Sequence, residues 1–169
     1  MSEAQQISQA AAKLRAELDS YHVSLLALES GFKGYSDAVK NELVESLARV
    51  KEPLPPGKLL ARLPFIRTTQ NEASMQTVFI NNLRSPHTDA RTSSLYGLQQ
   101  LNHPRLADFA EQALNDDSDD VLVAACSILI PKANQDARLR SRLQLLYSQK
   151  KDKPEFYTTI ELLKAHRMY

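Results

Sequence analysis

Glycine, cysteine and tryptophan are scarce or missing in this chain of 169 residues. It has four glycines, one cysteine and no tryptophan. A phosphate-binding loop needs several glycines close together so that the backbone can approach the anion, and the four here are too few and too scattered to form one. The lone cysteine, Cys126, cannot form an internal disulfide.

The chain also lacks an excess of charge of either sign and long apolar runs. The chain has 21 basic and 20 acidic residues and a net charge of +1, so no overall field attracts it to nucleic acid or to an anionic membrane. No stretch has the length of a transmembrane helix, or the charged start and apolar run of a signal peptide. We therefore expect a cytoplasmic protein with one sizeable core, as one domain or one domain with an appendage.

What the sequence does contain is helical periodicity. Apolar residues recur at helical spacing along most of the chain, and no segment alternates with a period of two, which predicts an all-α fold. Residues 3–30 carry a heptad-like seam, and residues 36–50 carry a second stripe after a capping serine at Ser36. The seam consists of Ile7, Ala11, Leu14, Leu18, Tyr21, Leu25 and Leu28, and the second stripe of Val39, Leu43, Leu47 and Val50.

The seam of the first helix needs a surface to cover it. It could pair with its own copy in a dimer, dock on another protein, or fold back on residues 36–50. Charged residues that would select a coiled-coil partner are sparse beside it, and the short connection from Gly31 to Tyr35 suits an antiparallel return. We therefore expect an N-terminal helical hairpin over residues 1–52 and a monomer, with a dimer through the first helix as the alternative.

A proline-containing linker with a short helix is predicted over residues 53–70, because Pro53, Pro55 and Pro56 cannot lie inside a helix. From residue 71 to 169 the chain repeats a unit of 31 to 34 residues. The stretches "HTDARTSSLYGL" (87–98), "SDDVLVAACSIL" (118–129) and "PEFYTTIELL" (154–163) align, and each follows another amphipathic helix, at 71–84, 103–114 and 136–148. Such paired helices are typical of an α-solenoid.

The stretch from Val121 to Ile130 is apolar almost throughout, so that its own composition does not distinguish a buried strand from a helix. Its aligned copies show a 3.6-residue period, which favours a helix. We expect Ser118 to cap this helix and Pro131 to end it. Three aligned columns should be buried in every copy: Leu95, Cys126 and Ile160; Leu98, Leu129 and Leu163; Ser94, Ala125 and Thr159.

The stretch "HPRLADFAEQALNDDSDDVLVAACSIL" resembles a short HEAT repeat of the phycobilisome lyase-like group. It has a proline near the start of the first helix, an acidic turn, an aspartate before the second helix and an alanine-rich second helix. "INNLRSPHTDARTSSLYGLQQL" matches the later part of the template, with Asp89 and Arg91 in an Asp-x-Arg variant, whereas Leu122 stands where the family often has an arginine. The resemblance covers about residues 71–166 and implies three helix pairs that act as an interaction scaffold.

No residue pattern indicates catalysis, a cofactor or a metal. The four histidines lie in separate segments without the spacing of metal ligands, and "NDDSDD" lacks the central glycine and the distal glutamate of a calcium loop. Cys126 has no basic neighbour on its helix face and is interpreted as a small core residue. We therefore expect a protein that is not an enzyme.

Two kinds of partner remain. In a HEAT-like array the second helices line the concave face, and a turn of 100° per residue places a mixed apolar and polar strip there, suited to a helix or peptide. Its main residues are Tyr96, Gln99, Val123, Ser127, Tyr157 and Glu161, with Thr92, Ile130 and Lys164 beside them. Val123 and Ile130 could equally pack between repeats instead. Alternatively, the segment 132–153 has a local charge of +5 and could bind nucleic acid, with phosphate contacts from Arg138, Arg140 and Arg142.

Overall fold

The computed structural model describes residues 5, 8, 9, 12, 34–49 and 60–169. Every regular element in these residues is a helix, which confirms the predicted all-α class for this part of the chain. The chain divides into two compact units, Met1–Leu101 and Asn102–Tyr169, and each is described by itself. The predicted seam from Ile7 to Leu28 lies outside the described residues.

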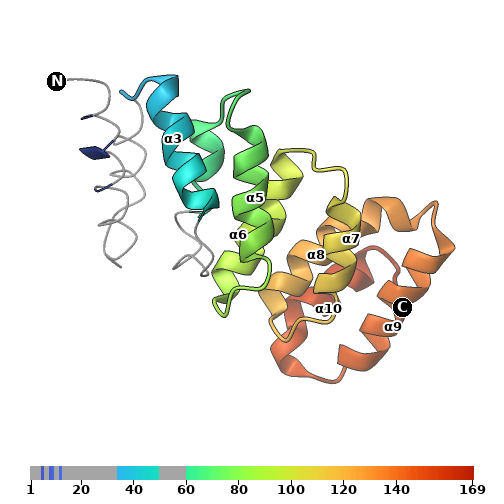
Figure 1. Cartoon of the computed structure of the whole chain (residues 1–169). Coiled ribbons are helices and arrows are strands. Elements are labelled where there is room, and N and C mark those ends of the chain that lie inside the picture. Colours follow the sequence, from blue (N-terminus) through green and yellow to red (C-terminus); the bar gives the residue numbers. More distant parts are fainter. Residues whose placement is uncertain (1–4, 6–7, 10–11, 13–33, 50–59) are drawn as a thin grey trace. The chain divides into compact units, whose positions relative to one another are not determined.

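The described residues 34–49 and 60–101 of the first unit form the helices α3 (Asp37–Ala48), η1 (Leu63–Ile66, a 3-10 helix), α5 (Glu72–Asn82) and α6 (Thr88–Gln100). Helix α5 packs between α3 and α6, and η1 contacts α6; Figure 1 shows α5 and α6 lying against each other. Helix α3 begins as predicted, because the Ser36 hydroxyl accepts a hydrogen bond from the Val39 N–H at 3.4 Å. Val39, Leu43 and Leu47 are buried as expected, and Val50 lies outside the described residues.

A buried polar cluster joins α3 to the turn that precedes α5. The fully buried Asn71 side chain donates to the Ile66 carbonyl at 3.0 Å and accepts from the Thr68 N–H at 2.9 Å. The Thr68 hydroxyl in turn donates to the Asn41 side chain on α3. Buried polar groups cost stability unless they are hydrogen-bonded, so these mutual bonds set the position at which α5 begins.

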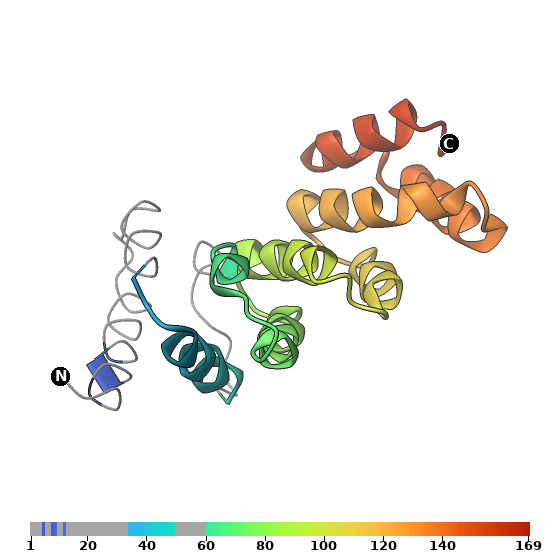
Figure 2. The ribbon, with the colours of Figure 1, turned by 90° about the horizontal axis from the view of Figure 1, so that it is seen from above.

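The second unit contains four α-helices and one 3-10 helix: α7 (Leu106–Ala113), α8 (Asp119–Ala133), α9 (Ala137–Lys150), η2 (Pro154–Phe156) and α10 (Tyr157–Ala165). Helix α8 packs against α7, α9 and α10, and Figure 2 shows α8 and α10 side by side along their lengths. The predicted helix over Val121–Ile130 is confirmed. Only Val123 and Ser127 in this stretch are half-buried, and its other side chains are buried.

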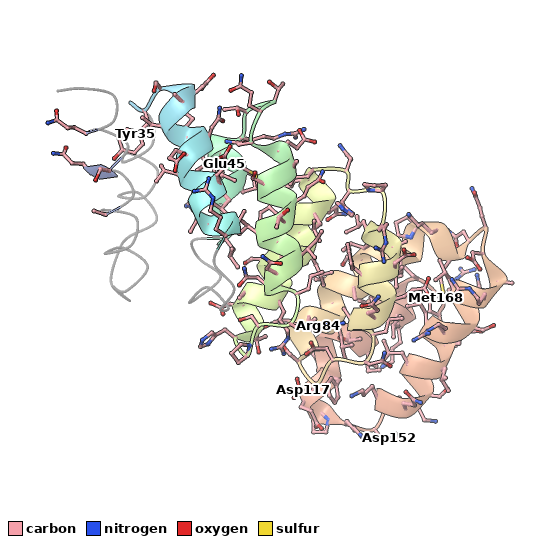
Figure 3. The ribbon with its side chains drawn as sticks, in the orientation of Figure 1. Tyr35, Glu45, Arg84, Asp117, Asp152 and Met168 are labelled. Carbon is pink, nitrogen blue, oxygen red and sulfur yellow. The ribbon has the colours of Figure 1, made fainter. Side chains whose placement is uncertain are left out.

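The aligned columns behave alike in all three helix pairs. Leu98, Leu129 and Leu163 form one column and are fully buried, and so are Ser94, Ala125 and Thr159 of the small-residue column. The third column, Leu95, Cys126 and Ile160, is at most 5% exposed. Equivalent positions in α6, α8 and α10 therefore face a core, as the internal alignment predicted. The two connections inside the pairs of the second unit, marked by Asp117 and Asp152, lie at its lower end in Figure 3.

Helix α8 begins where it was predicted to begin, but its capping and its predicted end need correction. Ser118 occupies the N-cap position, but its side chain makes no capping hydrogen bond. Pro131 lies inside α8, which continues to Ala133. A proline removes the N–H that would bond to the carbonyl four residues earlier, here that of Ser127. This loss falls in the last turn of the helix, and the nearly complete burial of Ala133 supplies packing that holds the turn after it.

The last residues fold back along α9. Arg167 has a positive φ of 56°, which ends α10 in a left-handed turn, and the Met168 N–H donates to the Leu163 carbonyl at 2.9 Å. Met168 is fully buried and is marked in Figure 3. From α9, Arg140 donates to the Arg167 carbonyl and Gln144 to the Tyr169 carbonyl. One face of α9 is therefore covered by the chain that follows α10.

A carboxylate on α8 caps a different helix. Asp119 accepts hydrogen bonds from the Thr158 N–H at 3.1 Å and the Thr159 N–H at 2.9 Å, in the first turn of α10, and from the Thr159 hydroxyl. Burial alone would raise the pKa of the Asp119 carboxyl, but the hydrogen bonds from Thr159 and Thr158 outweigh it and hold that pKa below its ordinary value.

We expect Asp119→Ala to lower the free energy of unfolding by about 1–2 kcal/mol at pH 7, because the first turn of α10 loses its cap. A carboxyl whose pKa is depressed by folding stabilises the native state above its ordinary pKa, and this contribution is lost as the pH falls through the native value. The deficit of the variant should therefore shrink below about pH 4. Urea unfolding followed by circular dichroism at pH 7 and pH 3 measures it.

Asp120→Ala is the matched control, because Asp120 is the next residue in the same first turn and is exposed. Its loss should stay within about 0.5 kcal/mol. Equal losses in the two variants would show that the cap on α10 contributes nothing beyond the charge at the start of α8.

Candidate functional site

Two of the predicted partner-binding residues lie on α6 in the first unit. Tyr96 is 37% exposed and Gln99 is exposed. Beside Tyr96 lies a hollow of about 240 Å³, lined by Leu60, Ala61, Pro64, Ser93, Tyr96, Gly97 and Gln100. Next to Pro64 the Phe65 ring is 67% exposed, with the Arg62 guanidinium 5.3 Å from its centroid. This surface offers aromatic faces and a hollow about the size of one large side chain.

The other four predicted residues lie in the second unit. On α8, Val123 and Ser127 are half-buried, and the Ser127 hydroxyl donates to the Val123 carbonyl of its own helix at 2.8 Å. On α10, Tyr157 is 69% exposed and Glu161 pairs with Lys164 at 2.8 Å. Tyr157 is thus the largest exposed apolar group of this set.

Ile130, which the helical turn placed beside the strip, is only 5% exposed and is therefore part of the core rather than of a binding surface. Turning each helix by 100° per residue, as if it stood alone, assigns only one of its faces to the core. Helix α8 contacts three other helices, so Ile130, which lies one turn after Cys126 at the margin of the strip, is buried as well.

The three arginines predicted to contact phosphates have different surroundings on α9. Arg138 forms a two-pronged ion pair with Glu111 of α7, with both nitrogen–oxygen distances at 2.7 Å. The hydrogen bond and the charge of Glu111 raise the pKa of the Arg138 guanidinium. Arg140 faces the terminal chain and donates to the Arg167 carbonyl at 3.3 Å. Arg142 is exposed and has no ion pair within the described part of the chain.

A groove between α7 and α9 brings Arg138 and Arg142 together. Its polar half, about 330 Å³, is lined by Asp108, Glu111, Gln112, Asn115, Arg138 and Arg142. Its more apolar half, about 320 Å³, is lined by Leu114, Asn115, Arg142, Leu145, Leu146 and Gln149. Asn115 and Arg142 line both halves, so the two lie next to each other.

The sequence prediction missed this groove. One signal was present, because Arg138, Arg142, Leu145 and Gln149 recur at steps of four, three and four and so share one face of a helix. The opposite wall could not be inferred in the same way, since Glu111 lies 27 residues before its partner Arg138.

Cys126 lies where the prediction placed it, fully buried in α8. Burial, with a smaller contribution from the Asp119 carboxylate, raises the pKa of its thiol to about 12. The thiolate is the reactive form of cysteine, so this side chain acts as a core residue. In residues 34–49, 60–169 and the few described before them, no three His, Cys, Asp or Glu side chains are grouped so that they could hold a metal ion.

No helix of the described part of the chain is long and apolar enough to cross a membrane. No protein-family model, no curated protein and no solved structure matches the sequence or the fold of the chain.

Proposed function

We propose that the chain is a noncatalytic protein-interaction module, an adaptor or scaffold that binds a helix or an extended peptide. The observation that carries this proposal is the exposure of large apolar side chains on firmly packed helices. Tyr157 is 69% exposed, whereas Thr159 and Ile160 of the same helix are at most 5% exposed. Aromatic side chains on a rigid support lose little conformational freedom on binding and are enriched among the residues that dominate protein interfaces.

We infer further that the helix pairs stack as a short HEAT-like α-solenoid in a cytoplasmic protein. Support for the stacking comes from the columns of α6, α8 and α10 that are buried at equivalent positions and from the resemblance of residues 71–166 to HEAT repeats. Support for the compartment is the single cysteine, which is free and buried, because proteins of oxidising compartments use paired cysteines.

The binding surface is tested by Tyr96→Glu on α6 and Tyr157→Glu on α10, each of which introduces a charge on an exposed aromatic position. We expect at least one of them to lower the affinity for a protein partner recovered from native lysate by about tenfold or more. Truncating or charging an aromatic residue at an interface costs about 2 kcal/mol of binding free energy. Isothermal titration calorimetry with the purified partner, at two ionic strengths, measures the loss. The affinity for such a partner should depend weakly on salt.

Gln135→Glu is the matched control, because it adds the same charge at an exposed position between α8 and α9. Its affinity should equal that of the parent. Unchanged binding in both tyrosine variants would contradict the proposed surface, provided that their helical circular-dichroism spectra match that of the parent.

Nucleic acid is the second candidate, because α9 carries four basic side chains and no acidic one. If it is the partner, affinity for an oligonucleotide should fall steeply with salt and should be lost when Arg138, Arg140 and Arg142 are changed together to glutamine. The Glu111–Arg138 pair counts against it, since that arginine is already neutralised within the unit.

A further inference from the structure

Helix α9 presents three different faces to its surroundings. Leu139, Leu143 and Leu146 are buried in the core, and Arg140 and Gln144 are hydrogen-bonded to the terminal chain. The third face carries Arg138, Arg142, Leu145 and Gln149 and forms one wall of the groove with α7. This third face is open to a partner, and it is the one that lines the groove.

On this face one arginine forms an ion pair within the chain and the next one does not. Arg138 holds the Glu111 carboxylate in a two-pronged pair. Arg142 follows one turn later, lines both halves of the groove and is exposed, without an ion pair in the described part of the chain. An arginine binds a carboxylate through two parallel N–H groups, as the Arg138 pair displays, so Arg142 offers the same recognition to a carboxylate from outside.

Beyond Arg142 the groove becomes apolar. Leu145 lies one turn further along the same face and is 57% exposed, while Leu114 and Leu146 below it are nearly buried. Covering the exposed Leu145 side chain with an aliphatic side chain of a partner would bury apolar surface and so favour binding. One turn of helix separates Arg142 from Leu145, about 5 Å along the axis.

We propose that the groove between α7 and α9 binds a partner-protein helix that carries an acidic side chain and an aliphatic side chain one turn apart, the carboxylate on Arg142 and the aliphatic group on Leu145. The inference rests on the proposed protein-binding function and assigns it a second surface, separate from Tyr96 and Tyr157. The spacing matches because side chains three or four residues apart on a helix lie on one face.

The polar wall of the groove favours a protein over a polynucleotide. In the half that Arg142 lines, Glu111 is already paired with Arg138, and Asp108 is paired with Arg105. Among the charged residues that line this half, Arg142 is therefore the one left to bind an anion, which suits a single carboxylate better than a run of phosphates. In the leucine half Arg142 is the only charged lining residue, so a polynucleotide backbone would find no second counter-charge there. The groove therefore complements one negative charge followed by an apolar group, rather than a row of negative charges.

The test uses defined helical peptides and the full chain labelled with nitrogen-15. The probe is an alanine–glutamine peptide with acetylated and amidated ends. It contains two glutamate–leucine pairs, and the two residues of each pair are four positions apart. Three matched peptides replace glutamate by glutamine, glutamate by lysine, or leucine by alanine. Titrations followed by NMR should shift the side-chain amides of Asn115 and Gln149, and both the glutamine and the alanine peptides should bind about fivefold or more weakly than the probe.

Charge reversal gives the decisive comparison. The Arg142→Glu variant should no longer bind the glutamate peptide and should bind the lysine peptide more tightly. Leu145→Ser should lower the affinity for the glutamate peptide about fivefold. Lys132→Glu, the same charge change at an exposed position at the end of α8, should keep the preference of the parent. Arg142 and Leu145 are exposed, so these variants should keep the melting temperature of the parent.

The other outcomes overturn the inference. It fails if no peptide shifts the groove amides at millimolar concentration, or if Arg142→Glu leaves the preference for glutamate unchanged. Peptide binding that is lost in Tyr157→Glu but not in Arg142→Glu would reject the groove and leave the proposed protein-binding function in place. Displacement of the glutamate peptide by a thymidine dodecamer at the same amides would assign the groove to nucleic acid instead.

Discussion

Cys126→Asp should lower the free energy of unfolding by about 3 kcal/mol or more at pH 7, because it places a carboxylate where no hydrogen-bond donor was provided. The thiol that it replaces is fully buried in the middle of α8, the helix that contacts α7, α9 and α10. The carboxylate of Asp119, which already acts on the Cys126 thiol, would add repulsion between like charges. Urea unfolding followed by circular dichroism measures the loss.

The pH dependence separates the effect of charge from that of shape. Burial raises the pKa of the new carboxyl in the folded state above its unfolded value near 4. A raised carboxyl pKa destabilises the native state at high pH, and this penalty disappears as the pH falls through the folded pKa and then the unfolded one. The deficit of Cys126→Asp should therefore shrink between pH 7 and about pH 4.

Cys126→Asn is the matched control for this experiment. It has nearly the shape of aspartate but no ionisable group, so it should lose less stability at pH 7 and show the same deficit at both pH values. If Cys126→Asp melts like the parent, position 126 is not packed as α8 indicates, and the buried column that it shares with Leu95 and Ile160 would be wrong.

The helices and their buried columns could be predicted from the sequence because the signal is local and repeated. A residue such as Leu129 is ambiguous alone, since its own helix is apolar almost all round. Alignment with Leu98 and Leu163 supplies a period, and burial of all three confirms the register. The same reasoning left Ile130 open between the binding strip and packing between repeats, because periodicity on one helix carries no information on how many neighbours cover it.

The features that the sequence did not indicate are contacts between side chains far apart along the chain. Local rules assign an acidic residue in a first turn to its own helix, yet the Asp119 carboxylate caps α10, with Thr158 lying 39 positions away. In the same way, the sum of charges over residues 132–153 counts Arg138 as open, although Glu111 neutralises it. For this reason the alternative prediction of three arginines that contact phosphates overlooked that Arg138 is paired and that Arg142 lies open beside an apolar hollow.

Gly97→Ala should destabilise the first unit by about 2–3 kcal/mol, although alanine is the better helix former. Gly97 lies inside α6, where replacement of glycine by alanine normally stabilises a helix by about 1 kcal/mol. Here a Cβ would come closer than 3.0 Å to three ring atoms of Phe79. Phe79 is fully buried on α5, so its ring cannot move away without disturbing the packing of α5 on α6. The steric cost therefore exceeds the gain in propensity.

A double-mutant cycle with Phe79→Leu tests this cause directly. Phe79→Leu alone should lose stability because it leaves a cavity, but leucine is smaller than the ring and leaves room for the new methyl group. The double variant Gly97→Ala, Phe79→Leu should therefore be more stable than the sum of the two single losses predicts, by about 1 kcal/mol or more. Urea unfolding of the four proteins gives this coupling energy. Stabilisation by Gly97→Ala alone, or strictly additive losses in the cycle, would show that α5 and α6 do not approach each other at this glycine.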